Sequence, residues 1–263
     1  MSTYLDSILA AHRERAANDL RDLDAAVEAA GFAGPIRSFD GAIRTASDGH
    51  GIAVIAEVKR RSPSQGDLDP DLDPATVAEE YEAGGAACLS VLTDREFFGG
   101  SAADLGSARA ACSLPVLRKD FTVSALDVCD ARTMGADAVL LIVAALNDVE
   151  LKSLLLLSER LSLTALVEVH DELELERALG AGARMIGVNQ RDLRTFEVDR
   201  QHALALGGSI PAEVTAVAES GIRNADDVSA LAGAGYRAVL VGETLIRSPS
   251  RGTAIGDLLG SGR

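Results

Sequence analysis

The sequence predicts an α/β fold, a closed (β/α)8 TIM barrel preceded by a helical extension. Four stretches repeat one pattern, a small-residue turn followed by a short apolar strand. They are AGGAACLSVLT (83–93), MGADAVLLIV (134–143), GAGARMIGVN (180–189) and GAGYRAVLVG (233–242). Further apolar runs fit between these repeats, so that eight runs end near residues 59, 93, 119, 142, 168, 189, 219 and 242. Helical patterns separate the runs, and eight strand–helix units are typical of this barrel.

The strands that complete the set are expected at Ile52–Lys59, Pro115–Lys119, Thr164–Glu168 and Val214–Glu219. They are apolar on both faces, which indicates a parallel sheet covered by helices. A doubly wound open sheet is the alternative. That fold needs a switch point for its ligand, and no G-x-G-x-x-G follows the first strand.

The helices between the strands carry recognisable start signals. DPATVAEEYEAGG has Pro74 near its first helical position, where proline is tolerated. Asn147 and Asn224 are expected as N-caps of the helices in NDVELKSLLLLSERLSL and NADDVSALAGAG.

The first 50 residues do not show this repeat of strand and helix. Two amphipathic helices are expected there, in TYLDSILAAHRERAANDL and RDLDAAVEAAG, as an extension (1–50) packed on the barrel (51–263) or across its mouth, within a single domain.

Composition excludes several classes of function. The 263 residues carry a formal net charge of -15, which argues against nucleic acid or an anionic membrane surface as the main partner. The three cysteines show no C-x-x-C spacing and are expected to be core residues in a reducing cytoplasm. The four histidines form no metal-binding pattern, so no dedicated metal site is expected. Neither a signal peptide nor an apolar run long enough to span a bilayer is found.

Charged and aromatic side chains gather where the predicted strands end, which in this barrel is the end that holds the active site. By contrast, the beginnings of the strands carry almost no charge. The strand-end groups, in chain order, are Glu57, Lys59, Ser62, Phe97, Phe98, Arg118, Lys119, Asp120, Phe121, Glu168, His170, Asn189, Arg191, Glu219, Ser220, Gly221, Gly242 and Glu243.

Each of these groups also has a purely structural interpretation. Glu57 and Lys59 share a strand face and could be an ion pair that closes the barrel. Lys119 and Asp120 could be a solvated loop pair, and Glu168 could cap the helix that follows it. Phe98 and Phe121 could be ordinary packing.

The turns after the seventh and eighth strands, ESGI and VGETL, indicate a phosphate site. Loops seven and eight of such barrels often bind phosphate through backbone N–H groups. Ser62 could add a hydroxyl, and Glu243 is expected to point its carboxylate away and offer its amide alone. Tight turns without a ligand are the alternative.

At this point the residues resemble the indole-3-glycerol phosphate synthase family. The motifs run in order from about residue 50 to 247. They are IAEVKRRSPSQG, LSVLTDREFFGGS, PVLRKDF, GADAVLLIVAAL, LVEVH, IGVNQRDL, VAESGI and LVGETLI. The motifs EVKRRSPS and LRKDF are the most particular to the family, and the helical leader also fits it.

The resemblance implies that the substrate is 1-(2-carboxyphenylamino)-1-deoxyribulose 5-phosphate, whose indole ring is closed with loss of CO₂ and water in tryptophan biosynthesis. It implies no metal or organic cofactor, and suggests a monomer. Lys119 matches the general acid and Glu168 a carboxylate of the acid/base work. A buried lysine can also have its pKa shifted toward a useful value.

The remaining roles are also implied by the resemblance. Lys59 would attract the carboxylate and phosphate of the substrate, with Glu57 orienting it. Asn189 and Glu219 would hold hydroxyls and neighbouring side chains, and Arg191 would strengthen the cationic side. The phosphate would be ringed by Ser62, Ser220, Gly221, Gly242 and Glu243, and the aryl ring would lie among Phe98, Phe121 and Leu140.

Three rivals remain open. A phosphoribosylanthranilate isomerase or a barrel like the tryptophan synthase α subunit would use the same phosphate loops. The isomerase is expected to depend on a Cys and an Asp at strand ends, where this sequence has Lys and Glu. A barrel that binds a phosphorylated ligand without turnover would be expected to have lost part of the Lys/Glu set.

Overall fold

The computed structural model describes residues 4–62, 65–192 and 197–260. The predicted ends of the extension (1–3) and of the barrel (261–263) lie outside these residues, as do 63–64 in the first loop and 193–196 in the sixth.

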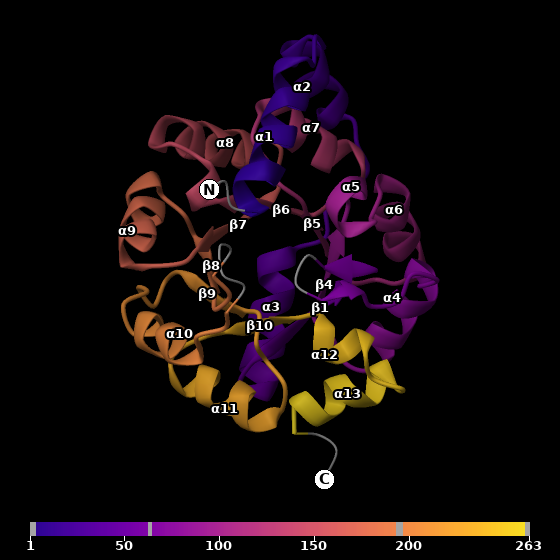
Figure 1. Cartoon of the computed structure of the whole chain (residues 1–263), viewed down its shortest axis with the longest axis vertical. Helices are drawn as coiled ribbons and strands as arrows, with labels where there is room; N and C mark the ends of the chain where they lie inside the picture. The colour runs from indigo at the N-terminus through magenta and orange to yellow at the C-terminus, as the bar shows by residue number, and fades with distance from the viewer. Residues whose placement is uncertain (1–3, 63–64, 193–196, 261–263) are drawn as a thin grey trace.

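Parallel strands close into a barrel, as predicted, in the order β1-β10-β9-β8-β7-β6-β5-β4 (Figure 1). Their bounds are β1 Ala53–Val58, β4 Cys88–Leu92, β5 Val116–Lys119, β6 Ala138–Ile142, β7 Thr164–Val169, β8 Met185–Asn189, β9 Thr215–Glu219 and β10 Ala238–Val241. The open-sheet alternative is therefore wrong. An unpredicted two-stranded hairpin, β2 (Arg61–Ser62) with β3 (Gly66–Asp67), lies in the first loop.

Helices surround the strands (Figure 1). Between β3 and the chain end they are α4 Pro74–Ala83, α5 Arg95–Phe98, α6 Ala102–Ala111, α7 Ala125–Thr133, a 3-10 turn η1 Val143–Ala145, α8 Asp148–Arg160, α9 Glu172–Ala181, α10 Arg200–Gly207, α11 Ala225–Gly233, α12 Glu243–Ile246 and α13 Arg251–Leu258. Asn147 and Asn224 cap α8 and α11, and Pro74 stands in the first turn of α4, all as predicted.

Strand register brings the predicted groups to one level of the barrel. Glu219 of β9 is paired with Asn189 of β8, and Glu168 of β7 is paired with Gly187 of β8. On the opposite side, Lys119 of β5 is level with Leu92 of β4. Because the strands are parallel, their carboxyl ends meet at one mouth, and these side chains are brought together there.

The N-terminal residues form α1 (Tyr4–Ala17) and α2 (Leu23–Gly31), near the predicted ranges, and also α3 (Phe39–His50), which the sequence analysis missed. Helix α3 contacts β1 and β4 at the other end of the barrel from the mouth. Its buried Phe39 and Ile43 are four residues apart, a helical spacing that could have revealed it. The hydroxyl of Thr215, at the start of β9, donates to Asp40 Oδ1 at 2.7 Å. The extension thus reaches both ends of the barrel.

Among the described residues, no helix combines the length and apolar character needed to cross a bilayer. Cys88, Cys112 and Cys129 are buried free thiols, as expected of core residues.

Candidate active site

A cavity of about 420 Å³ opens at the carboxyl ends of the strands. Every residue to which the family resemblance assigns a role lines it: Glu57, Lys59, Ser62, Phe98, Lys119, Phe121, Leu140, Glu168, Asn189, Arg191, Glu219, Ser220, Gly221, Gly242 and Glu243. Of the other strand-end groups, Asp120 lines the cavity, whereas Phe97, Arg118 and His170 do not. A volume of this size accommodates a small organic phosphate.

The centre of the cavity is Lys119, which we group with Glu168 and Glu219 as the lysine cluster. Lys119 Nζ lies 3.3 Å from Glu168 Oε2 and 3.6 Å from Glu219 Oε2. Both carboxylates are almost fully buried, and Glu219 Oε1 has no hydrogen-bond partner among the described residues. An unpartnered buried carboxylate oxygen is costly, so its presence indicates a position that a ligand can use.

The charges of the lysine cluster shift its pKa values in different directions. Burial alone would lower the pKa of Lys119, but the carboxylates of Glu168, Glu219 and Glu57 raise it well above its ordinary value. The expectation that burial tunes this lysine downward is therefore wrong: its neighbours outweigh desolvation, and Lys119 is an ammonium group at neutral pH.

The two carboxylates differ from each other. Burial would raise the pKa of Glu168, yet Lys119 and His170 hold it below its usual range. Burial and the charge of Glu168 raise the pKa of Glu219 above its usual range. Since two adjacent buried carboxylates resist double ionisation, the pair favours one carboxylate and one carboxylic acid.

Glycine at position 187 makes room for this arrangement. A Cβ atom added to Gly187 would collide with the carboxylate of Glu219. The small residue in β8 therefore allows the Glu219 side chain to lie across the strand beside it.

Glu57 and Lys59 form an ion pair at the end of β1 that also lines the cavity, so the pair is not confined to closing the barrel. Two other structural interpretations fail. Asp171, not Glu168, caps α9. Asp120 is buried and paired with Arg118 rather than forming a solvated pair with Lys119.

One wall of the cavity is apolar. The rings of Phe98 and Phe121 lie with their centroids 6.4 Å apart, and Leu140 of β6 is buried beside the cavity. Tyr4, Leu5 and Ile8 of α1 also line it, which the sequence analysis missed. The apolar face of α1 was visible in the sequence, but the surface that it covers was not.

The opposite wall is built from backbone turns and cations. Ser220 and Gly221 both have left-handed backbone conformations, with φ of 68° and 71°. Glycine adopts this region freely, and the conformation turns the chain sharply after β9. The Glu243 carboxylate lies 3.4 Å from Arg247 Nε and 3.9 Å from Arg191 Nη2. The Glu243 carboxylate therefore lies among cations that line the same cavity.

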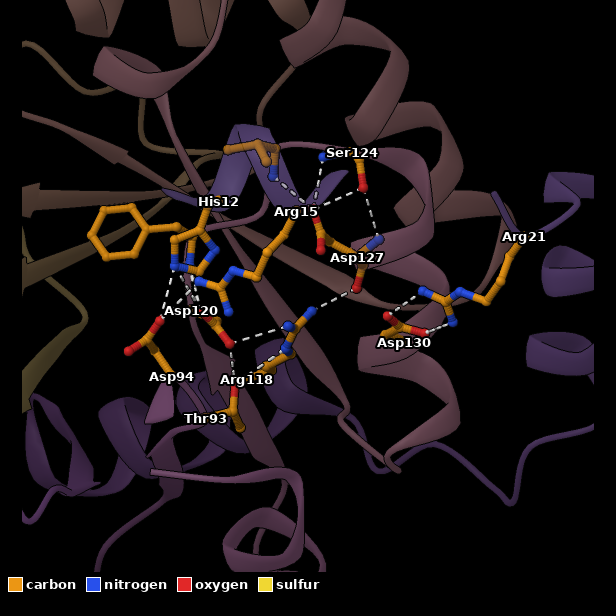
Figure 2. Close-up of polar contacts among 12 residues, drawn as sticks. His12, Arg15, Arg21, Thr93, Asp94, Arg118, Asp120, Ser124, Asp127 and Asp130 are labelled. Carbon is orange, nitrogen blue, oxygen red and sulfur yellow. Dashed lines mark hydrogen bonds and ion pairs between the residues drawn. The ribbon is translucent and has the colours of Figure 1, made fainter. Parts of the chain in front are cut away.

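A second cluster, buried except for Arg15, fixes α1 beside the mouth (Figure 2). We call it the anchor cluster; its members are His12, Arg15, Asp94, Arg118 and Asp120. His12 Nε2 and Arg15 Nη2 lie 3.0 and 3.3 Å from Asp94 Oδ2, and Arg118 Nη2 lies 3.1 Å from Asp120 Oδ2. The His12 ring also packs against the Phe121 ring in a tilted arrangement, with centroids 5.3 Å apart. The anchor cluster therefore joins α1 to the loops that carry Phe98 and Phe121.

His12, Asp94 and Asp120 form the group of described residues whose ligand atoms could converge on a metal ion, since these atoms lie within 4.8 Å of one another. The same carboxylates accept from Arg15, Arg118 and the backbone N–H groups of Phe97 and Phe121. A cation would have to displace two guanidinium groups, so this group fits an ion-pair network better than a metal site.

Comparison with known proteins decides the family. The family model of indole-3-glycerol phosphate synthase matches residues 5–258. The chain belongs to this family. It is 49% identical over 262 residues to the indole-3-glycerol phosphate synthase of Polaromonas sp. (strain JS666), covering 99% of each chain. It is 50% identical to indole-3-glycerol phosphate synthase 1 of Streptomyces coelicolor, over 100% of this chain and 95% of that one.

Solved structures agree on the fold. A 3-hexulose-6-phosphate synthase superposes with a TM-score of 0.64 at 14% identity, over 80% of this chain and 99% of that one. A thiamine phosphate pyrophosphorylase from Pyrococcus furiosus gives 0.60 at 16% identity, over 80% and 94%. At these identities the likeness shows the barrel and nothing of the reaction.

Proposed function

We propose that the protein closes the indole ring of 1-(2-carboxyphenylamino)-1-deoxyribulose 5-phosphate, releasing CO₂ and water, as a carboxy-lyase of tryptophan biosynthesis. Membership of the family supports the reaction. The observation that carries the proposal is the placement of a partly buried ammonium group between two buried carboxylates, in a cavity with an apolar wall on one side and backbone turns with cations on the other.

The substrate fits these walls by chemistry. Its aryl ring would lie among Phe98, Phe121 and Leu140. Its phosphate would lie at the turns of Gly221 and Gly242, ringed also by Ser62, Ser220 and the amide of Glu243. Lys59, oriented by Glu57, and Arg191 would attract the two anionic ends, which supports binding because the net charge of the chain is strongly negative.

Ring closure needs an electrophilic ketone. Lys119, kept as an ammonium group by its neighbours, would donate a proton to the ketone oxygen while the aryl carbon that bears the carboxylate attacks the carbonyl carbon. Loss of CO₂ then restores the aromatic ring. The new hydroxyl would leave as water with a proton from the carboxylic acid of Glu219, and the adjacent ring carbon would give up its proton to Glu168, which is ionised and therefore able to accept it. Glu219 and Asn189 would hold the hydroxyl and the neighbouring side chains.

The isomerase rival is less well supported. It would require a cysteine at the site, and none of the three cysteines, all described, lines the cavity.

We also propose that the chain acts as a monomer in the cytoplasm, with the extension and barrel folding as one unit and without a metal or organic cofactor. Sedimentation velocity at working concentrations checks the first point, since a dimer would sediment as a clearly larger species.

The experiment that tests the function is incubation with the carboxyphenylamino-deoxyribulose phosphate, followed by indole fluorescence. Fluorescence is expected to rise with time and to be abolished by boiling the protein. If the ligand binds, as measured by calorimetry, and no fluorescence appears, the barrel that binds without turnover is the correct reading.

A further inference from the structure

A line of three side chains leads from the surface of the protein to Glu168. His170 follows β7, and its Nε2 atom lies 3.4 Å from Glu168 Oε1. Its Nδ1 atom lies 3.0 Å from Glu174 Oε2, and its backbone N–H donates to the same oxygen at 2.8 Å. The side chains of Glu174 and His170 are 17% and 16% exposed, whereas that of Glu168 is 2% exposed. The line therefore connects solvent with the lysine cluster.

The charges around the imidazole favour its cationic form. Glu168 faces it from β7 and Glu174 from α9. His202 of α10 donates through Nε2 to the carbonyl oxygen of His170 at 2.7 Å and does not touch the ring nitrogens. Burial would lower the pKa of His170, but the two carboxylates raise it to about 10.

We propose that His170 is a positioning residue for the reaction, whose imidazolium, held by Glu174, keeps Glu168 ionised and fixed beside Lys119. This inference rests on the proposed function.

The two oxygens of Glu168 have separate partners, which gives His170 its effect. Oε2 faces Lys119 at 3.3 Å, whereas Oε1 accepts from Asn189 Nδ2 at 3.2 Å and faces His170. Positive charge on both sides holds the carboxylate in place. Without the imidazolium, Glu168 would hold a proton more readily, because a buried carboxylate near Glu219 is easily protonated. A protonated Glu168 cannot accept the proton that leaves the closing ring.

The test is the pH dependence of kcat for the full chain with its ring-closure substrate, in wild type, His170→Asn and Glu174→Gln. An asparagine keeps a polar group but not the charge. The pH at which kcat falls to half on the acid side is expected to rise by about 1 to 3 pH units in His170→Asn, the usual effect of a lost opposite charge.

Glu174→Gln should give a different signature. Its amide oxygen still accepts from His170, but the imidazole loses one of the two charges that keep it protonated. Its acid limb is therefore expected to coincide with that of wild type, because the imidazole is still protonated there. Above the lowered pKa of the imidazole, kcat is expected to fall below that of wild type, because Glu168 loses a charge that holds it beside Lys119. Glu172→Gln, which removes a charge from the exposed first turn of the same helix, is the matched control and should follow wild type throughout.

The possible outcomes distinguish a failure of the proposed function from a failure of the role of His170. Wild type without turnover would refute the proposed function. Active wild type with an unchanged acid limb in a folded His170→Asn would refute the role of His170. If His170→Asn does not fold, Glu174→Gln decides: a constant ratio to wild type from pH 6 to pH 9 would overturn the inference.

Discussion

Two charged clusters lie on opposite sides of the end of β5. They differ in whether every buried carboxylate oxygen accepts a hydrogen bond. Successive residues of a strand point to opposite faces, so Lys119 points into the cavity while Arg118 and Asp120 point toward α1 and the surrounding helices. In the anchor cluster, both oxygens of Asp94 and both of Asp120 accept hydrogen bonds. In the lysine cluster, Glu219 Oε1 has no partner among the described residues.

The difference teaches how buried charge is used in this barrel. A network whose carboxylates are fully bonded holds elements together and resists change. A network that leaves a carboxylate oxygen without a hydrogen bond, and in which two carboxylates resist being ionised together, can still bind a substrate. Burial and charge alone do not distinguish the two; the count of hydrogen bonds to each carboxylate oxygen does.

The largest effect should come from the lysine cluster. Lys119→Ala is expected to lower kcat by roughly 10²–10⁴, the scale of a lost proton donor, because no other cation of the described residues lies between the two carboxylates. Steady-state fluorescence kinetics measure it, with calorimetry to show that substrate still binds. Turnover at the wild-type rate would remove Lys119 from its role.

The anchor cluster should respond in the opposite way. Asp94→Asn is expected to lower the free energy of unfolding at pH 7 by roughly 3–5 kcal/mol, since it leaves buried His12 without its charged partner, while kcat changes less than about tenfold. Urea denaturation and kinetics on the same samples measure both. A large loss of kcat with unchanged stability would show that the two clusters have been assigned the wrong way round.

The loss of stability in Asp94→Asn should depend on pH. Burial would raise the pKa of Asp94, but the hydrogen bonds from His12 and Phe97 bring it below its ordinary value. Its contribution is therefore present above the unfolded-state pKa near 4 and is lost as the pH falls through the folded-state pKa. The stability gap between wild type and Asp94→Asn should narrow from pH 7 toward pH 3.5; a widening gap would contradict the assignment.

A smaller change sharpens the comparison within the cavity. Gly187→Ala is expected to cost about 1–3 kcal/mol of stability and to lower kcat, because the added methyl group displaces the carboxylate of Glu219. Gly180→Ala is the matched control: it lies in α9 with open space around it, and should be neutral or slightly stabilising. Equal kinetics for the two variants would show that the position of Glu219 is unimportant.

The smallest effect should follow from metal removal. Treatment with EDTA is expected to change neither kcat nor the melting temperature, since guanidinium groups already neutralise the acids near His12. A drop in melting temperature that Mg²⁺ or Zn²⁺ restores would show that His12, Asp94 and Asp120 hold a metal ion.

The sequence predicted much of this arrangement because the barrel has a simple periodicity. Apolar runs gave the strands, and the residues that end them gave the cavity. The anchor cluster could not be predicted, since His12 and Asp94 are 82 residues apart and no local pattern pairs them. The pKa of Lys119 was mispredicted for a similar reason: its direction depends on carboxylates from three different strands, and their distances are set only by the closed barrel.

The central claim is that Lys119 lies between an ionised Glu168 and a protonated Glu219. Carbon-13 NMR of glutamate carboxyl groups, assigned with Glu168→Gln and Glu219→Gln, measures both titrations directly. We predict that Glu168 titrates below the ordinary glutamate range and Glu219 above it. Titration of both carboxylates near pH 4.3, the value of an unperturbed glutamate, would contradict the account.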